Sequence, residues 1–187
     1  MRLVLASASP RRRELLAQAG FVFEVVAADI DETRRVGEAA VDYLQRLALE
    51  KTEVVAVRFP DAMVVGADTT VVLDGEVMNK PVDAADAERM LRWLSGRTHQ
   101  VYTGLAVVRG GVKVSGVERT DVVFREIEEE ELAVYLASGD AMDKAGAYGI
   151  QGYAARWIPR IEGDYFNVVG LPLSAVVGML GEAVNRD

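Results

Sequence analysis

A basic segment near the start of the sequence could bind a small polyanion. Residues 7–13 are Ser-Ala-Ser-Pro-Arg-Arg-Arg, and a serine followed by a proline predicts the start of a helix. The first turn of a helix carries unpaired N–H groups and a partial positive charge, so it attracts phosphate. Arg11 and Arg12 fall in that turn, where cations are unfavourable unless an anion is bound. The segment therefore indicates either a phosphate site or a solvated basic helix start.

Lys51 lies on the apolar side of a helix that we predict over residues 41–57. Leu44, Leu47, Ala48 and Val55 form one stripe along that helix, and Lys51 falls on the same stripe. A buried ammonium without a partner is costly. Either the side chain extends to the surface, or its ammonium meets an anion in a cleft.

Asp68 interrupts the most continuous β-branched run of the sequence, residues 63–73. Aspartate is depleted in strand interiors, and the neighbouring Gly66 and Ala67 leave room for a ligand or another backbone segment. We favour a functional carboxylate over a β-bulge in which Asp68 caps a local turn. Together with the acidic residues 29–32, Asp68 could give a hard divalent cation two oxygen ligands, which substrate phosphates would supplement.

Two later segments carry weaker signals. Lys80 lies between a predicted hairpin and a predicted helix, where an exposed lysine needs no special explanation. Residues 143–152, Asp-Lys-Ala-Gly-Ala-Tyr-Gly-Ile-Gln-Gly, combine small residues with one aromatic ring and one amide. That composition suits a backbone close to a flat ligand, and it suits a mobile loop equally well.

The elements that position these residues alternate between strands and helices. We expect strands over residues 2–6, 21–26, 63–73, 76–79, 99–108, 112–124 and 157–161, and helices over 10–20, 41–57, 81–94, 128–136 and 173–184. Turn signals at 74–75 and 109–111 predict hairpins, so the sheet should contain antiparallel as well as parallel pairs. The 187 residues predict one α/β domain of at most two closely joined lobes.

The composition excludes several classes of function. With no cysteine and a single histidine, the chain has no thiolate zinc site, iron–sulfur cluster or cysteine nucleophile. A net charge of −8 argues against non-specific nucleic-acid binding, which draws on clustered cations. The longest apolar run, residues 168–180, is shorter than the roughly 20 residues of a membrane helix. We expect a cytoplasmic protein that binds neither nucleic acid nor membrane.

The motifs taken together resemble the Maf family. The matching segments are Leu-Ala-Ser-Ala-Ser-Pro-Arg-Arg (5–12), Leu-Ala-x-x-Lys (47–51), Val-Gly-Ala-Asp-Thr (65–69), Lys-Pro (80–81), Leu-Ser-Gly-x-Thr-His (94–99), residues 143–152 and Gly-Asp-Tyr-Phe-Asn-Val-Val-Gly-Leu-Pro (163–172). The resemblance implies a fold like that of the inosine triphosphate pyrophosphatases, with an elongated mixed β-sheet flanked by helices and two lobes around a cleft. It also implies a homodimer and a divalent cation, Mg²⁺ or Mn²⁺.

The resemblance further implies an activity and roles for individual residues. The family hydrolyses the α–β phosphate bond of nucleoside triphosphates, and residues 144–152 are similar to the branch that acts on dTTP and UTP. Asp68 would be the catalytic proton acceptor, or with Glu32 a metal ligand. The implied phosphate-binding residues are Ser7, Arg11, Arg12, Lys51 and Lys80, and the implied determinants of substrate specificity are Arg11, Thr69 and Gln151.

Two alternatives to this activity stay open. The family is also associated with inhibition of septum formation, so a non-enzymatic regulator that binds nucleotides is one. The other is a pyrophosphatase for CTP, 7-methyl-GTP or a modified nucleotide. Gln151 could pair its amide donor and acceptor with a pyrimidine edge, which favours the dTTP/UTP assignment.

Overall fold

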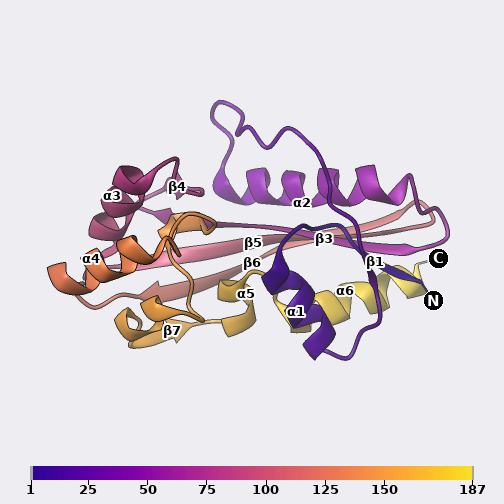
Figure 1. The fold of residues 1–187 in the computed structure, drawn as a ribbon. Coiled ribbons are helices and arrows are strands. Elements are labelled where there is room, and N and C mark those ends of the chain that lie inside the picture. Colours follow the sequence, from indigo (N-terminus) through magenta and orange to yellow (C-terminus); the bar gives the residue numbers. More distant parts are fainter. Residues whose placement is uncertain (1, 187) are drawn as a thin grey trace. The chain divides into compact units, whose positions relative to one another are not determined.

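The computed structural model describes residues 2–186, which form one sheet of seven strands together with helices (Figure 1). The strands are β1 (Leu3–Leu5), β2 (Glu24–Val25), β3 (Met63–Leu73), β4 (Glu76–Met78), β5 (Thr98–Arg109), β6 (Val112–Val123) and β7 (Arg160–Glu162). The helices are α1 (Pro10–Gln18), α2 (Ala40–Ala56), α3 (Ala84–Leu94), α4 (Glu129–Ser138), α5 (Tyr165–Val169) and α6 (Leu173–Asn185), with 3₁₀ helices η1 (Ala145–Ala147) and η2 (Tyr153–Trp157).

The sheet mixes parallel and antiparallel pairs, as predicted. Its hydrogen-bonded order is β2-β1-β3-β5-β6-β7, and β4 pairs with β3. Strand β1 is parallel to both β2 and β3, whereas β4 is antiparallel to β3 and β7 is antiparallel to β6. The predicted fold class, an α/β fold with a mixed sheet flanked by helices, is confirmed.

Contacts between residues divide the chain into two compact units, and neither is continuous in sequence. The first unit comprises residues up to 69, 103–118 and from 170 onwards, and the second comprises residues 70–102 and 119–169. The predicted cleft between two lobes stays a prediction.

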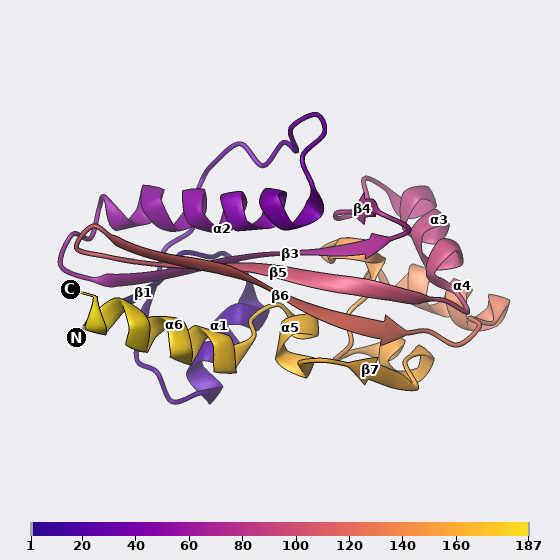
Figure 2. The same ribbon diagram turned by 180° about the vertical axis from the view of Figure 1, so that it is seen from behind.

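The first unit contains the parallel strands and the longest helix. Helix α2 lies along one face of the sheet there, and α1 and α6 lie along the opposite face in both views (Figures 1 and 2). Helix α1 begins where the sequence predicts, because the Ser9 hydroxyl accepts a hydrogen bond from the Arg12 N–H at 3.4 Å and Pro10 takes the first helical position. Buried apolar side chains of β1, β3 and α2 pack together, among them Val4, Val55 and Val64.

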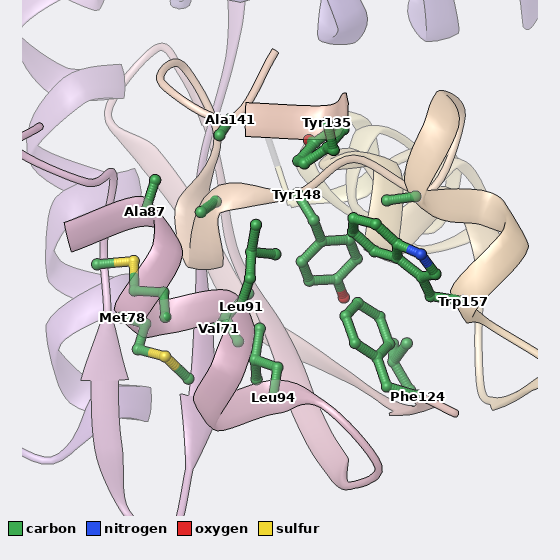
Figure 3. Packing of buried hydrophobic residues seen from close by; sticks show 14 of the residues in the cluster. Val71, Met78, Ala87, Leu91, Leu94, Phe124, Tyr135, Ala141, Tyr148 and Trp157 are labelled. Carbon is green, nitrogen blue, oxygen red and sulfur yellow. The ribbon is translucent and has the colours of Figure 1, made fainter. Parts of the chain in front are cut away.

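The second unit is built around a cluster of aromatic rings (Figure 3). Phe124 packs edge-on against Tyr148 with ring centroids 4.8 Å apart, and Tyr135 packs edge-on against Trp157 at 5.1 Å. Leucine side chains of α3 complete the cluster. Such edge-to-face pairs add to the stabilisation from apolar burial.

Several predicted boundaries are wrong, each for a local reason. The third helix begins at Ala84 rather than at residue 81, because the Asp83 carboxylate accepts from the Asp86 N–H at 2.8 Å and caps the helix. The strand expected over 157–161 is β7, which spans Arg160–Glu162 and so begins three residues later than predicted. The reason is that Trp157 is the last residue of a 3₁₀ helix, and its indole N–H donates to Glu131 at 3.1 Å.

Two short elements also differ from prediction. The strand expected over residues 21–26 is reduced to two residues in β2, and α5 was not predicted from the sequence. Within the described residues, no helix is both long and apolar enough to cross a membrane.

Candidate active site

Predicted site residues of the first unit lie where the parallel pairing of β1 and β3 ends. The last register pair joins Leu5 to Val65, and the Ala6 N–H still donates to the Val65 carbonyl at 2.8 Å. Ser7 follows at once on one strand, and Asp68 lies a few residues further along the other. Open α/β sheets bind ligands at the carboxyl ends of parallel strands, and both residues occupy that position.

Two glycines allow helix α2 to approach the sheet closely on one face. A Cβ atom on Gly66 would lie 2.3 Å from the Thr52 hydroxyl and 3.2 Å from the Ala48 carbonyl of α2. A Cβ on Gly104 of β5 would lie 2.2 Å from the Leu44 carbonyl. The room that the sequence predicts beside Asp68 is therefore used, at Gly66, by another backbone segment.

This close approach places Lys51 of α2 against Asp68 of β3. The Lys51 residue is only 9% exposed, so its ammonium does not extend to the surface. It contacts Oδ1 of Asp68 and lies 2.8 Å from Oε1 of Glu32. The Asp68 side chain is 14% exposed and that of Glu32 is 58% exposed. Of the two alternatives for Lys51, the structure shows the one in which the ammonium meets anions.

The opposite face of β3 carries a guanidinium group. Consecutive strand residues point to opposite faces, so Thr69 faces away from Lys51. Its hydroxyl accepts from Nη2 of Arg12 at 2.9 Å, and Nε of Arg12 donates to the Gly170 carbonyl at 2.8 Å. Burial lowers the pKa of Arg12, and the negative charge of Asp68 partly offsets this effect.

Ser7 connects this guanidinium to the turn between β1 and α1. The Ser7 hydroxyl accepts from the Ser9 N–H at 3.1 Å and from Nη1 of Arg12 at 3.4 Å. Arg11, the next candidate, lies in the same first helical turn and is half-buried. The serine, both arginines and the start of α1 thus form one polar corner of the first unit.

Lys80 and Gln151 lie in the second unit, and both are exposed. Among residues 2–186 neither side chain makes a hydrogen bond or an ion pair. In the loop that precedes Gln151, Gly146 adopts a φ of 66°, and a Cβ there would lie 2.7 Å from the Val71 side chain. At Gly146 the small residue therefore allows close packing within the protein.

Two residues that contact Thr69 or Arg12 were missed by the sequence reasoning, namely Thr103 and Gly170. Thr103 is fully buried in β5, and its hydroxyl lies 2.9 Å from that of Thr69. The signal was available, because a threonine between Val101 and Leu105 on a buried strand must have a polar partner. Gly170 contributes only its carbonyl, which no side-chain pattern could have indicated.

The donors at Asp68 and Glu32 fit a magnesium-type cation that also binds substrate. Within residues 2–186 no cluster of three or more Asp, Glu or His side chains could by itself enclose a metal ion. Mg²⁺ commonly takes one or two carboxylates and completes its shell with waters and substrate phosphates. Two carboxylate groups gathered around one ammonium match that requirement in number and in chemistry.

Comparison with known proteins finds one family model and several relatives that match nearly the whole chain. The family model described as "Maf-like protein" matches residues 2–183. The chain is 52% identical over 183 residues to a dTTP/UTP pyrophosphatase of Koribacter versatilis, covering 98% of this chain and 95% of that protein. It is 55% identical over 181 residues to a protein of the same name from Myxococcus xanthus, covering 97% of this chain and 92% of that protein.

Two solved structures are distantly similar to the chain. A nucleoside-triphosphatase (dITP/XTP pyrophosphatase) from Mycobacterium abscessus aligns with a TM-score of 0.48 and 17% identity, covering 100% of this chain and 98% of that one. The Staphylococcus aureus Ham1 protein aligns with a TM-score of 0.47 and 16% identity, covering 66% of this chain and 72% of that one.

Proposed function

Because the chain belongs to the Maf family, we propose that it is a nucleoside triphosphate pyrophosphatase acting on dTTP and UTP. The products would be the nucleoside monophosphate and pyrophosphate. Relatives named for this activity share 52% and 55% of their residues with the chain over nearly its whole length, which supports the substrate assignment.

One observation carries the proposal, namely the juxtaposition of cations and carboxylates on β3. Lys51 contacts Asp68, Arg12 contacts the next residue, Thr69, and the negative charge of Asp68 also acts on the guanidinium of Arg12. Fixed cations bind phosphate oxygens, and a carboxylate beside them can hold a metal ion or accept a proton. A site that hydrolyses a triphosphate needs both kinds of group.

The proposed reaction is a displacement by water at the α-phosphorus. Water forms a new P–O bond there, the bond from the α-phosphorus to the bridging oxygen breaks, and pyrophosphate leaves with the electron pair. Negative charge grows on the phosphate oxygens during this step, and Arg12 and Lys51 would stabilise it. Asp68 would accept a proton from the attacking water or help to hold the cation.

We further propose that Glu32 and Asp68 hold Mg²⁺ or Mn²⁺ together with the substrate. When bound, such a cation neutralises phosphate charge and polarises a phosphoryl oxygen. The two carboxylates lie at one ammonium in this structure, which supports their acting on a shared cation. Ser7, Arg11 and Lys80 would contribute further contacts to the phosphates.

The finer assignments follow from the family resemblance. We propose that Arg11, Thr69 and Gln151 distinguish between nucleotides, with the Gln151 amide pairing with a pyrimidine edge. We also propose a cytoplasmic homodimer. Light scattering at several protein concentrations tests the dimer, and a monomer throughout would contradict it.

The test of the proposed activity is pyrophosphate release from a panel of canonical and modified nucleoside triphosphates. The wild type should release pyrophosphate from dTTP and UTP with Mg²⁺ and not after chelation. Asp68→Asn should bind UTP and lose turnover by at least about a hundredfold, the lower range for a lost acid–base group. Glu50→Gln is the matched control, because Glu50 is a carboxylate of α2 that pairs with Arg46.

One other outcome would reject the proposed activity, and a second would change its substrate. Nucleotide binding without turnover by the wild type, unaffected by Asp68→Asn, would favour a regulator that only binds nucleotides. Preferential turnover of CTP or 7-methyl-GTP would keep the reaction and replace the substrate.

A further inference from the structure

The buried hydroxyl of Thr103 is not assigned any role by the proposed function. Thr103 lies on β5 with its side chain completely buried, so no bound molecule can reach it without rearrangement. Its hydroxyl is 2.9 Å from the hydroxyl of Thr69, which is half-buried. Thr69 is thus the accessible member of the pair and Thr103 the inaccessible one.

Counting hydrogens shows why the pair matters. A threonine hydroxyl has one hydrogen to donate and two lone pairs to accept, whereas an arginine can only donate. The Thr69 oxygen accepts from Arg12 at 2.9 Å, which occupies one lone pair. If Thr103 donates to the second lone pair, the Thr69 hydrogen is left for a third partner. If Thr69 donates to Thr103, that hydrogen is consumed inside the protein.

The backbone beside Thr103 is fixed by close packing. Gly104, the next residue, has no space for a Cβ because the Leu44 carbonyl of α2 would lie 2.2 Å from it. The position of the Thr103 hydroxyl is therefore set by contact between a strand and a helix. A donor held in this way can orient its neighbour without moving itself.

We propose that Thr103 is a positioning residue of the nucleotide site, which orients the Thr69 hydroxyl so that its hydrogen faces an oxygen of the bound nucleoside triphosphate. This inference rests on the proposed function, because it assumes that a nucleotide occupies the first unit next to Thr69. The same bond keeps Thr69 in place as an acceptor for Arg12. Thr103 acts through these two residues and touches no substrate.

The experiment is a double-mutant cycle read out by nucleotide affinity. Thr103→Val removes the hydroxyl and keeps the shape of the side chain, and Thr69→Val does the same at the accessible position. Dissociation constants are measured for the α,β-methylene analogue of UTP, which cannot be cleaved at the scissile position. Each single variant should weaken binding by about threefold to tenfold, the usual value of one hydrogen bond. The double variant should bind the analogue no more weakly than the single variant with the lower affinity, because both substitutions remove the same interaction.

Two control variants separate positioning from general damage to the fold. Thr103→Ser restores the hydroxyl and should bring affinity back to within about twofold of the wild type. Thr52→Val removes a buried hydroxyl in the same unit that donates only to the Ala48 carbonyl of its own helix, and affinity should be unchanged. With UTP as substrate, Thr103→Val should raise KM and leave kcat within about twofold.

Affinity measurements keep this inference separate from the proposed function. If the wild type binds the analogue and cleaves no nucleotide, the proposed activity fails and the cycle still tests Thr103. Unchanged affinity in Thr103→Val, failure of Thr103→Ser to restore it, or effects of the two valine substitutions that add independently would each overturn the inference.

Discussion

The candidate residues of the two units differ in how much of their environment the protein provides. In the first unit, Lys51, Asp68 and Arg12 are largely buried and each contacts other side chains. In the second unit, Lys80 and Gln151 are exposed, and among residues 2–186 their side chains contact no polar partner. The first group is arranged before any substrate binds, whereas Lys80 and Gln151, if they contact the nucleotide as proposed, would become ordered only on binding.

This contrast matches the two tasks that the proposed function requires. Charged groups that stabilise a transition state are most effective when they are fixed in advance, because no reorganisation is then needed. Side chains that recognise a base can be mobile, at a cost of about 0.5–1.5 kcal/mol for each one immobilised. Substitutions in the first group should therefore reduce both catalysis and stability, and substitution of Gln151 in the second should change recognition alone.

The largest effect is expected from Lys51→Met. Removing the ammonium leaves Asp68 and Glu32 next to each other without their shared cation, so both activity and thermal stability should fall. We expect kcat/KM for UTP to drop by about a hundredfold or more, as for loss of one transition-state contact. Kinetics and thermal denaturation measure the two effects.

Lys113→Met is the control for this substitution. Lys113 also pairs with a carboxylate of α2, Glu53, and it is more exposed. The Lys113→Met variant should keep nearly full activity. If Lys51→Met kept kcat/KM within about fivefold of the wild type, or Lys113→Met lost as much, the contrast between the units would lose its basis.

A smaller effect confined to specificity is expected from Gln151→Ala. Because the side chain is exposed and makes no polar contact with the described residues, its loss should leave the melting temperature unchanged. Discrimination between UTP and GTP should decrease by about tenfold, corresponding to one or two hydrogen bonds to the base. A nucleotide panel compares the kcat/KM values. Unchanged selectivity, or a clear loss of stability, would contradict the assignment of Gln151 to recognition.

The smallest effect concerns the core of the second unit, where His99 is fully buried and its Nε2 lies 2.7 Å from the Tyr148 hydroxyl. Burial lowers the pKa of His99 to about 3. Its ordinary pKa near 6.5 applies in the unfolded chain, so the unfolded state takes up a proton first as the pH falls. The contribution of His99 to stability is complete above pH 6.5 and declines progressively below it. The expected loss between pH 7 and pH 6 is about 0.7 kcal/mol.

The matching variant is His99→Gln, which can still bond to Tyr148 and does not ionise. Chemical denaturation at pH 7 and pH 6 should show a smaller change in unfolding free energy for this variant than for the wild type. Equal changes would mean that the pKa of His99 in the folded state is close to its ordinary value, so that the folded and unfolded states take up the proton together. Catalytic parameters of the variant measured at pH 7.5 should be close to those of the wild type.

Parts of this arrangement could be predicted from local sequence alone. Strand β3 has the predicted bounds, because a β-branched run followed by a turn leaves few alternatives. Lys51 and Asp68 were singled out because a charged residue in an apolar pattern must be compensated somewhere.

Other parts depend on contacts between distant segments. The Arg12–Gly170 bond joins residues 158 positions apart, and the pairing of Lys51 with Asp68 depends on how closely α2 approaches β3. The helix predicted over residues 81–94 begins at Ala84, where the Asp83 side chain caps it.

The contacts of α2 with Gly66 and Gly104 couple folding to the assembly of the candidate site. A methyl group at either position would lie too close to atoms of α2, at 2.3 Å from the Thr52 hydroxyl or 2.2 Å from the Leu44 carbonyl, so we expect α2, which carries Lys51, to shift. The docking of α2 and the pairing of Lys51 with Asp68 are therefore a single event, so a locally opened form of this helix has no assembled site. Any nucleotide bound to the docked form stabilises the helix by mass action, and slower amide exchange along α2 would report occupancy.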